Sequence, residues 1–313
     1  MPDAIAACGN AAVVGLLPVL ELMANHPEPA ADGRLRAVTS RHNAVVKELR
    51  RLFHEASPNP KGEIAVEGLH LVEEAIRSSL RITSVFFAES ARERVHKLLP
   101  QLPKQTEALV LPDDVFSSAV PTETPQGIAG LVQVREYAIG DLLKPQPALL
   151  IVAAGLQDPG NLGTIARSGE AFGATGLLLA EKTVSPWNWK AVRASAGSLF
   201  RLPTAKVEMA MALRQLQEQG IAVLATSSHK GTPISGSDLT RPIALIIGNE
   251  GAGISKDVLA QVDETVVIPH SERVESLNAG IAASVLLYEA SRQRKRAFTT
   301  EGTELTEKNR PKS

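Results

Sequence analysis

The sequence has little cysteine, few aromatic residues and almost no net charge. Its 313 residues include one cysteine, Cys8, which excludes an internal disulfide and a thiolate metal site and suits a reducing cytoplasm. Aromatic residues make up 4%, too few for a protein that stacks many bases on aromatic platforms. The formal net charge of −1 means that any affinity for nucleic acid must come from local patches. The histidines lie scattered from His26 to His270 without ligand spacing, so we expect no metal site.

The two ends of the chain differ from its middle. Residues 4–24 are apolar, but no Lys or Arg precedes them, and Pro18 and Glu21 interrupt the run, which disfavours a signal peptide or a membrane span. We expect residues 1–36 to be a poorly ordered extension and linker, or to include a helix packed on a partner. The polar residues 298–313 are expected to form a disordered tail. The protein is therefore expected to be cytoplasmic, without membrane association.

Residues 37–138 are expected to form a small α/β domain. Helical spacing and short β-type runs alternate along this part of the chain. The expected helices lie at 40–56, 69–79 and 93–99, and the expected strands at 63–68, 82–90 and 107–112. A proline-rich joint at 142–148 then leads to a second domain.

The second domain, 146–297, has the strand–helix rhythm of a parallel sheet. The expected strands are 148–154, 176–180, 221–227, 242–250 and 264–270, and the expected helices are 161–172, 188–199, 208–219, 255–261 and 276–296. Sheets of this kind bind ligands at the carboxyl ends of their strands. Three polar loops follow expected strands in this domain, and they are the candidate site.

The first loop, DPGNLGTIAR, follows the apolar run at 148–155 and ends at Arg167. Only Gly160 and Gly163 lie close together, so the loop is neither the dinucleotide fingerprint G-x-G-x-x-G nor a P-loop. Asn161 can be a helix N-cap, and Arg167, close to two turns later, can be a solvated charge. The alternative is that both side chains face a ligand.

The second loop, IIGNEGAGIS at 246–255, follows another apolar strand. Its glycines Gly248, Gly251 and Gly253 allow positive φ and close approach of the backbone to a ligand. Glu250 places a carboxylate where a simple turn does not need one. Glycine-rich turns are common after strands, so this loop alone is a modest sign of a binding site.

The third loop lies within 266–294, after the last expected strand. Ser276 is a good N-cap for the long helix that follows, which places Asn278 inside the first turn, where an acidic or small apolar residue would serve the helix better. The run AGIAAS gives this helix a flat face that allows close packing, including packing against a second copy.

Together and in this order, the three loops DPGNLGTIAR, IIGNEGAGIS and IPHSERVESLNAGIAAS resemble the three motifs of the SpoU/TrmH family of RNA ribose 2′-O-methyltransferases, in the SPOUT superfamily. WKAVRASAGSLFRLP resembles the family's segment between the first two motifs, and the match covers about 140–296. VEGLHLVEEAI and ETPQGIAGLV resemble the family's substrate-binding domain, which is related to RNA-binding ribosomal proteins. Gly280 replaces a more usual β-branched residue, and His270 stands where many relatives have Met, so substrate detail can differ.

The resemblance implies a deep trefoil knot in the parallel-sheet domain, with S-adenosylmethionine bound in it in a bent conformation. An unknotted chain is the physical default, so this expectation comes from the family alone. The cofactor-binding residues that the resemblance implies are Gly248, Asn249, Gly251, Gly253, Ile268 and Leu277.

The resemblance also implies a catalytic role for Arg167, with Asn161, Glu250, Ser276 and Asn278 positioning the ribose, the methyl donor and the arginine. A guanidinium is effectively never deprotonated in proteins, so we interpret Arg167 as an electrostatic stabiliser of the reacting oxygen. Transfer from a sulfonium needs no metal.

We therefore expect an S-adenosylmethionine-dependent RNA 2′-O-methyltransferase. Ribosomal RNA is favoured over tRNA because the extra N-terminal domain resembles those of rRNA-modifying relatives. A non-catalytic RNA-binding or ribosome-assembly factor of the same fold is an alternative, although such a protein would be expected to lose the polar motif residues. The βα rhythm alone also fits a dinucleotide-dependent oxidoreductase, but the G-x-G-x-x-G fingerprint is missing.

Two surfaces are expected to bind partners. The basic stretch 34–51 is expected to contact RNA phosphates, unless it is only a solvated helix face. Its candidates are Arg41, Lys47, Arg50 and Arg51. The helix at 276–296 is apolar nearly all round, which is typical of a helix that is fully buried or shared with a partner. With the family resemblance, this predicts a homodimer through the C-terminal domain, with the active site beside the seam and Ala283 in the interface.

Overall fold

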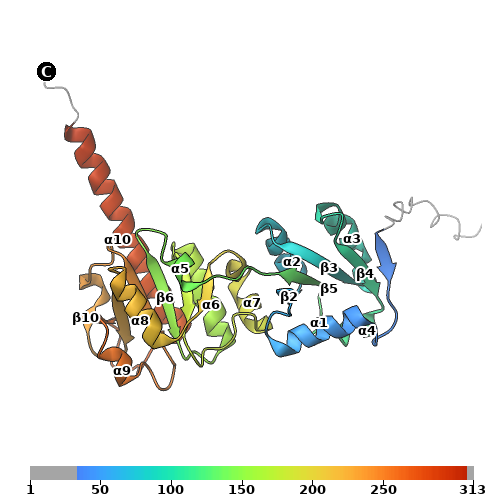
Figure 1. The fold of residues 1–313 in the computed structure, drawn as a ribbon, viewed down its shortest axis with the longest axis horizontal. Coiled ribbons are helices and arrows are strands. Elements are labelled where there is room, and N and C mark those ends of the chain that lie inside the picture. Colours follow the sequence, from blue (N-terminus) through green and yellow to red (C-terminus); the bar gives the residue numbers. More distant parts are fainter. Residues whose placement is uncertain (1–33, 309–313) are drawn as a thin grey trace, which may run out of the picture.

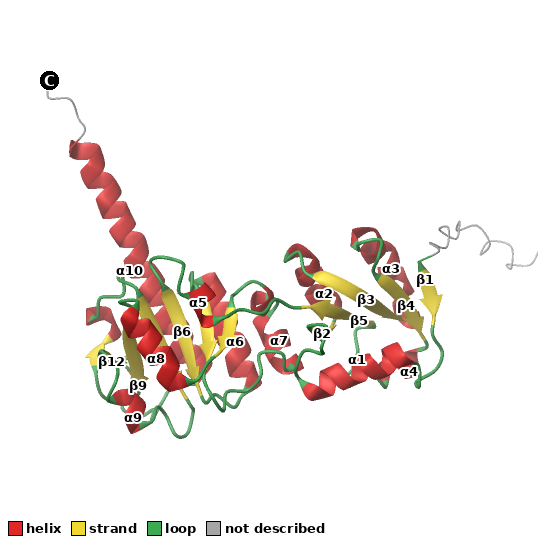
Figure 2. Ribbon diagram, in the orientation of Figure 1, coloured by secondary structure: helices red, strands yellow, loops and turns green. Residues whose placement is uncertain are grey.

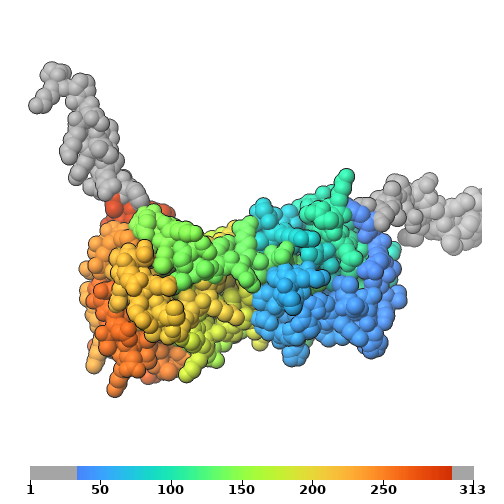
Figure 3. Space-filling model, viewed as in Figure 1, coloured from blue at the N-terminus to red at the C-terminus, as the bar shows by residue number. Residues whose placement is uncertain are grey.

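The computed structural model describes residues 34–308 and the side chains of 34–297. The predictions for 1–33 and 309–313 fall outside these residues. The described chain forms two α/β domains side by side, as the ribbon and the space-filling view both show (Figures 1 and 3). The predicted α/β class is confirmed, with a smaller N-terminal domain and a parallel sheet in the C-terminal domain.

The N-terminal domain is a five-stranded sheet with helices on both faces. The strand order is β1-β4-β3-β5-β2, and β5 runs antiparallel to both of its neighbours. The strands are β1 (Leu35–Ala37), β2 (Glu63–Glu67), β3 (Arg81–Ala88), β4 (Glu107–Leu111) and β5 (Ile128–Gln133). The helices are α1 (Ala44–Glu55), α2 (Leu69–Arg77), α3 (Arg92–Leu98) and α4 (Asp113–Ser117), with 3₁₀ turns η1 (Glu89–Ala91) and η2 (Leu99–Gln101).

Alternation along the strands divides the core of this domain into two layers. Leu49 of α1 and Phe116 of α4 pack with Phe86 on one face of the sheet. Val72 of α2 packs with Phe87, the next residue of β3, on the other face. Successive strand residues point to opposite faces, so a run such as the one in β3 serves both layers. Strand β1 begins at Leu35, so the boundary predicted at 36 lies within the first strand.

The C-terminal domain is a seven-stranded sheet in which every pair is parallel, in the order β10-β12-β9-β11-β6-β7-β8. The strands are β6 (Leu149–Ala154), β7 (Gly176–Leu179), β8 (Thr204–Lys206), β9 (Ala222–Ser227), β10 (Thr232–Pro233), β11 (Ile243–Gly248) and β12 (Glu264–Val267). The helices are α5 (Ile139–Leu142), α6 (Pro159–Ala171), α7 (Trp189–Ser195), α8 (Met209–Glu218), α9 (Lys256–Leu259) and α10 (Ala279–Lys308), with 3₁₀ turns η3 (Ser198–Phe200) and η4 (Ile234–Gly236). All five strands predicted for this domain are present.

Helices cover both faces of this sheet as well (Figure 2). Helices α6, α7 and α10 pack on the face that carries Ile151 and Leu245, and α5, α8 and α9 pack on the face that carries Val152 and Ile246. The chain runs from β6 outward to β7 and β8, then returns to build β9 and β11 on the other side of β6. The strand order therefore reverses between β6 and β11, the position at which open α/β sheets bind ligands.

Helix α10 begins three residues later than predicted. Asn278, not Ser276, caps it: the Asn278 Oδ1 accepts from the backbone N–H of Ile281 at 3.2 Å, and its carbonyl accepts from Ala282 at 2.8 Å. The helix then continues to Lys308, so the boundary predicted at 297 lies within it. Arg294 holds α10 to the rest of the domain by donating to several backbone carbonyls.

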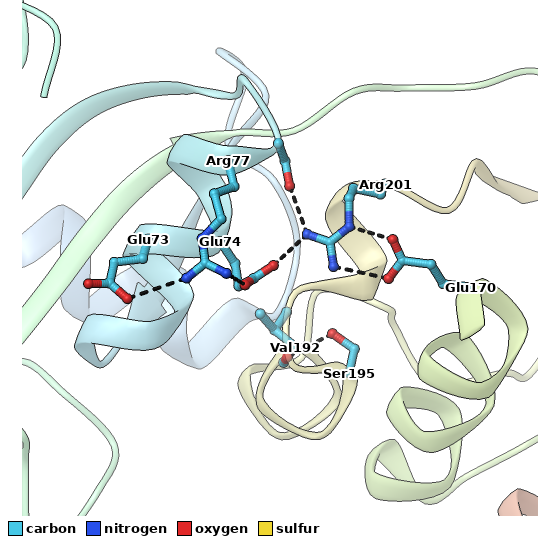
Figure 4. A network of polar contacts seen from close by, with 8 residues as sticks. Glu73, Glu74, Arg77, Glu170, Val192, Ser195 and Arg201 are labelled. Atoms are coloured by element: carbon cyan, nitrogen blue, oxygen red, sulfur yellow. Dashed lines mark hydrogen bonds and ion pairs between the residues drawn. The ribbon is translucent and has the colours of Figure 1, made fainter. Parts of the chain in front are cut away.

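A charged network joins the two domains (Figure 4). Arg201, which follows η3, donates to Glu170 at the end of α6 and to Glu74 of α2, the latter at 2.5 Å. Glu74 also accepts from Arg77 at 2.6 Å, and its side chain is only 8% exposed. The hydrogen bonds that Arg201 donates to Glu170 and Glu74 raise its pKa. A buried carboxylate needs such partners, so the network ties α2 of one domain to α6 of the other.

Candidate cofactor and RNA site

A cavity of about 290 Å³ lies at the carboxyl ends of β9, β11 and β12. Its walls come from three segments: 226–229, 247–254 and 266–286. All six residues predicted to bind a cofactor line it, as do Glu250 and Ser276 from the predicted catalytic set. The six are Gly248, Asn249, Gly251, Gly253, Ile268 and Leu277. The structure therefore brings together the second and third sequence loops.

The Asn249 side chain holds the glycine loop in shape. Its Oδ1 accepts from the backbone N–H groups of Gly251 and Ala252, both at 2.9 Å. Its Nδ2 donates to the Gly155 carbonyl at the end of β6, at 2.8 Å. The backbone of Asn249 pairs with Gly253, which has φ +66°. One side chain thus closes the loop on itself and fastens it to the neighbouring strand.

Gly248 is the position where the loop tolerates no side chain. A Cβ built there would lie 2.7 Å from Ile254 Cγ1, 2.8 Å from the Gly253 carbonyl carbon and 3.0 Å from its oxygen. Two of these atoms belong to the backbone, which cannot turn aside as the end of a side chain can. The β11 strand therefore ends in a glycine because the returning loop crosses directly over it.

We predict that Gly248→Ala weakens S-adenosylmethionine binding by about ten- to hundredfold. Forcing a methyl group into a packed site costs about 1–3 kcal/mol, and the cost falls on the loop conformation that forms the cavity, at 1.4 kcal/mol per tenfold in Kd. Calorimetric titration measures the change. Gly140→Ala is the matched control, because a Cβ at Gly140 meets nothing within 4 Å. Equal affinities in the two variants would contradict this reading of the loop.

Helix α6 connects the first sequence loop to this cavity. Asp158 is its N-cap and accepts from the Asn161 N–H at 2.7 Å, so the capping role considered for Asn161 is wrong. The Asn161 side chain is instead directed to the glycine loop, where its Nδ2 donates to Glu250 Oε1 at 2.7 Å. This hydrogen bond joins two predicted catalytic residues that lie 89 positions apart.

Arg167 and Asn278 do not line the cavity. Arg167 is exposed on α6 and makes no hydrogen bond or ion pair with any other residue that the structure describes. Asn278 is occupied as the N-cap of α10, close to Thr164 of α6: a Cβ on Gly280 would lie 3.2 Å from both the Asn278 Oδ1 and the Thr164 side chain. Helices α6 and α10 also meet at the hydrogen bond between Ser168 and Ser284, 2.7 Å long.

Residues 226–229 line the cavity without having been predicted from the sequence. They form the end of β9 and the turn after it, and this position at the carboxyl end of a parallel strand was the available signal. His229 lies with its ring 6.1 Å from that of His270, which follows β12. The His270 Nδ1 donates to the Ile268 carbonyl at 2.8 Å, which fixes the ring and leaves Nε2 as an acceptor when the ring is neutral.

The predicted RNA-binding stretch is largely engaged in contacts within the N-terminal domain. Arg41 pairs with Asp114, Arg50 donates to Ser118, and Arg51 pairs with Glu48 and Glu55. Arg41 holds the pKa of Asp114 below its usual value. The fourth candidate, Lys47, is exposed on α1 and makes no ion pair with a described residue.

Metal and membrane features were searched over the part of the chain that the structure describes. No group of three or more His, Cys, Asp or Glu side chains there could hold a metal ion. None of its helices combines the length and the apolar character needed to cross a membrane.

Comparison with known proteins identifies both domains. Residues 148–288 match the SpoU rRNA Methylase family, and residues 43–130 match the MRM3-like substrate binding domain. The chain is 31% identical to the 23S rRNA (guanosine(2553)-2′-O)-methyltransferase RlmP of Bacillus subtilis over 81% of this chain and 98% of that protein. It superposes with a TM-score of 0.71 on the AdoMet-bound SpoU methyltransferase AviRb from Streptomyces viridochromogenes, 28% identical, over 80% of this chain and 98% of that one. The AdoMet-bound rRNA methyltransferase from Sinorhizobium meliloti gives the same TM-score and identity over 83% and 98%.

The fold, the glycine-loop cavity and these similarities define an RNA methyltransferase with a separate substrate-binding domain. The chain belongs to the SpoU rRNA Methylase family.

Proposed function

We propose that this protein transfers a methyl group from S-adenosylmethionine to a ribose 2′-hydroxyl of ribosomal RNA. The observation that carries the proposal is the cavity at the carboxyl edge of the sheet, where the glycine loop lies against the N-terminus of α10 and Glu250 meets Asn161 of α6. Relatives named as rRNA 2′-O-methyltransferases support ribosomal RNA as the substrate. Other relatives are named tRNA/rRNA methyltransferases, so tRNA is the second candidate.

The residues present fit the cofactor. Partly exposed apolar side chains such as Ile254, Ile268 and Leu277 offer a surface for a flat ring, and the glycine loop exposes backbone groups that can bind the polar edges. Gly248, Asn249, Gly251, Gly253, Ile268 and Leu277 would hold the molecule. When bound, S-adenosylmethionine supplies an electrophilic methyl group on a positively charged sulfur.

The side chains around the cavity can then act on the RNA. A ribose hydroxyl is a weak acid, so its oxygen needs stabilisation as negative charge develops on it. Arg167 supplies a permanent positive charge and cannot itself take the proton. Asn161 and Glu250 hold the first turn of α6 against the glycine loop, and this contact orients the helix that carries Arg167. Ser276 and Asn278 shape the turn into α10, which closes the cavity.

Methyl transfer from labelled S-adenosylmethionine tests the proposal directly. Ribosomal RNA and tRNA, both transcribed in vitro and free of modifications, are offered separately. We expect transfer to ribosomal RNA at a single nucleotide, with the product resistant to alkaline cleavage at that position. Transfer only to tRNA would show that tRNA, not ribosomal RNA, is the substrate. Binding of RNA without methyl transfer to either RNA would favour a non-catalytic factor.

We propose that RNA is captured partly by α1, where Lys47 is exposed and unpaired among the described residues. Lys47→Ala is expected to lower the slope of log Kd against log salt by about 0.7–0.9, the release of one counterion. Filter binding across a salt series measures it. Lys97→Ala is the control, because Lys97 is equally exposed but lies on α3, on the opposite face of the sheet. An unchanged slope would make α1 an ordinary solvated helix face.

We also propose that the protein is a cytoplasmic homodimer whose C-terminal domain contains the family's trefoil knot. Two observations support a dimer. Arg167 lies outside the cavity that it would serve. Exposed apolar side chains also follow one another at helical spacing on α10: Ile281, Val285 and Tyr288. A second copy that covers α10 would place the active site beside the seam.

A further inference from the structure

A second cavity, of about 200 Å³, lies between the two domains. Its wall on the N-terminal side includes Glu67, Gly68 and Gln126, and its wall on the C-terminal side includes Trp189 and Arg193 of α7. It exists because α7 packs against β2, and it shares no lining residue with the cofactor cavity. The interdomain cavity is therefore a separate site in the molecule.

Glu67 is the unusual residue in this wall. Its Oε1 accepts from the Thr122 hydroxyl, but its Oε2 is buried and has no hydrogen-bond partner in the described chain. Burial raises the pKa of the Glu67 carboxyl, while the Thr122 hydroxyl, the charge of Arg193 and the backbone N–H of Gln126 oppose that shift. A buried carboxylate oxygen without a donor is costly, so a donor from a ligand would stabilise it. Glu67 lines the cavity, and the last torsion of a glutamate is soft, so its carboxylate is free to reorient toward a ligand.

The opposite wall carries an aromatic ring and a cationic side chain. Trp189 is one of two tryptophans in a chain poor in aromatic residues, and it is half-buried at the cavity. The Lys190 ammonium lies 5.6 Å from the centre of its ring. The Arg193 side chain is exposed and makes no hydrogen bond or ion pair with the residues described. Proteins read unpaired RNA bases by stacking them on aromatic rings or guanidinium planes and binding their edges.

We propose that the interdomain cavity binds one unpaired guanine of the RNA substrate, with Glu67 accepting from its N1–H and N2–H groups. The inference rests on the proposed function, because it takes RNA as the substrate. Guanine alone presents two adjacent N–H donors on its pairing edge. Adenine and cytosine place an acceptor beside their amino group, and uracil flanks its N–H with two carbonyls, so each would turn a lone pair toward the carboxylate.

The two cavities are lined by different residues, so the proposal places this guanine apart from the methyl donor. Binding of the guanine in the interdomain cavity would then fix the distance along the RNA between this guanine and the methylated nucleotide. The network of Arg201 with Glu74 and Glu170 holds that separation, since it joins the domain that carries Glu67 to the helix that carries Arg167.

Calorimetry with four tetranucleotides, UUGU, UUAU, UUCU and UUUU, tests the inference on the full-length protein. We expect UUGU to bind at least roughly tenfold more tightly than the others, and Glu67→Gln to remove that preference. Glutamine has the same shape but replaces one acceptor with a donor. Arg193→Ala is the second variant: it should weaken all four oligonucleotides together, because a charge on the phosphates does not discriminate between bases.

Two results would overturn the assignment: equal binding of the four oligonucleotides by the wild-type protein, or an intact guanine preference in Glu67→Gln. Methyl transfer by the wild-type protein and S-adenosylmethionine binding by Glu67→Gln are measured in parallel. If the wild-type protein transfers methyl groups to RNA but shows no guanine preference, only the guanine-binding role of the interdomain cavity is refuted. If it shows the preference but transfers no methyl group, only the proposed reaction is refuted.

Discussion

Replacing Arg167 with alanine is expected to lower kcat by roughly 10²–10³ and to leave the affinity for S-adenosylmethionine unchanged. The magnitude is that of removing one charge or donor that stabilises a developing oxyanion. The fold should not suffer, because the Arg167 side chain is exposed and has no partner among the described residues. Surface substitutions of this kind change stability by no more than about 0.5 kcal/mol. Single-turnover methyl transfer together with calorimetry of cofactor binding measures both quantities.

Two further variants sharpen this test. Arg167→Lys should recover little activity, because a point ammonium does not reproduce the planar guanidinium. Arg214→Ala is the matched control: Arg214 is equally exposed on α8 of the same domain and lies away from the cavity lining. Wild-type turnover in Arg167→Ala would contradict a catalytic role for Arg167. A loss of cofactor affinity that accompanies the loss of turnover would show that Arg167 binds the cofactor instead.

The strands could be predicted because they are buried on both faces. A strand such as β6, in which Leu149 to Ala153 are all fully buried, reads as a continuous apolar run, and the βα rhythm around it indicates a parallel sheet. The parallel direction then places the loops after β6, β11 and β12 at one edge. The glycine loop and the Ser276–Leu277 turn are therefore expected at the same edge from the sequence alone.

The helix caps could not be predicted with the same accuracy. Asp158 and Asn161 are both good capping residues within one turn, as are Ser276 and Asn278. For the first pair the structure shows a contact elsewhere in the fold that bears on the choice. Asn161 is engaged by Glu250, which leaves Asp158 to cap α6. Pro159 at the first helical position also favours Asp158 as the cap, but the contact of Asn161 with Glu250 cannot be read from the local sequence.

The free positive charges of the basic stretch 34–51 could not be predicted from the sequence either. Arg50 and Arg51 look like free charges in the sequence, with only Glu48 as an acidic neighbour in 34–51. In the structure Arg50 donates to Ser118, 68 residues away, and Arg51 is shared between Glu48 and Glu55. Long-range partners of this kind depend on how the sheet assembles, so charge density alone overstated the positive surface of α1.

The long helix α10 is the feature where sequence and structure differ in the most useful way. Its sequence is apolar nearly all round, but the structure separates two faces. Ala283, Leu286 and Leu287 are at most 1% exposed and pack into the domain core. Ile281 and Tyr288 are 53% and 55% exposed on the other side. Ala283, predicted to lie in a dimer interface, is therefore a core residue, and an arginine there would bury a charge and unfold the domain.

The surface that can bind a second copy is therefore the stripe of Ile281, Val285 and Tyr288. We expect the wild-type protein to sediment as a dimer of two 33.3 kDa chains at micromolar concentration, and Ile281→Arg to sediment as a monomer. In a two-fold interface one substitution places a charge on both sides of the seam, so its effect is doubled. Because Ile281 is exposed in the single chain, the thermal midpoint of the monomer should stay close to that of the wild-type domain.

Methyl transfer should fall with the dimer, by at least roughly tenfold, if the active site lies beside the seam and needs the second copy to bring Arg167 to a cavity. Met211→Arg is the matched control, since Met211 is 51% exposed on α8 and lies outside the stripe. It should remain dimeric and active.

A wild-type protein that sediments as a monomer would contradict the proposed dimer. If Ile281→Arg remains a dimer, the interface does not include this face of α10. A fully active monomeric Ile281→Arg would show that each chain completes its own site, and Arg167 would then have to reach the cavity of the same subunit by a movement of α6.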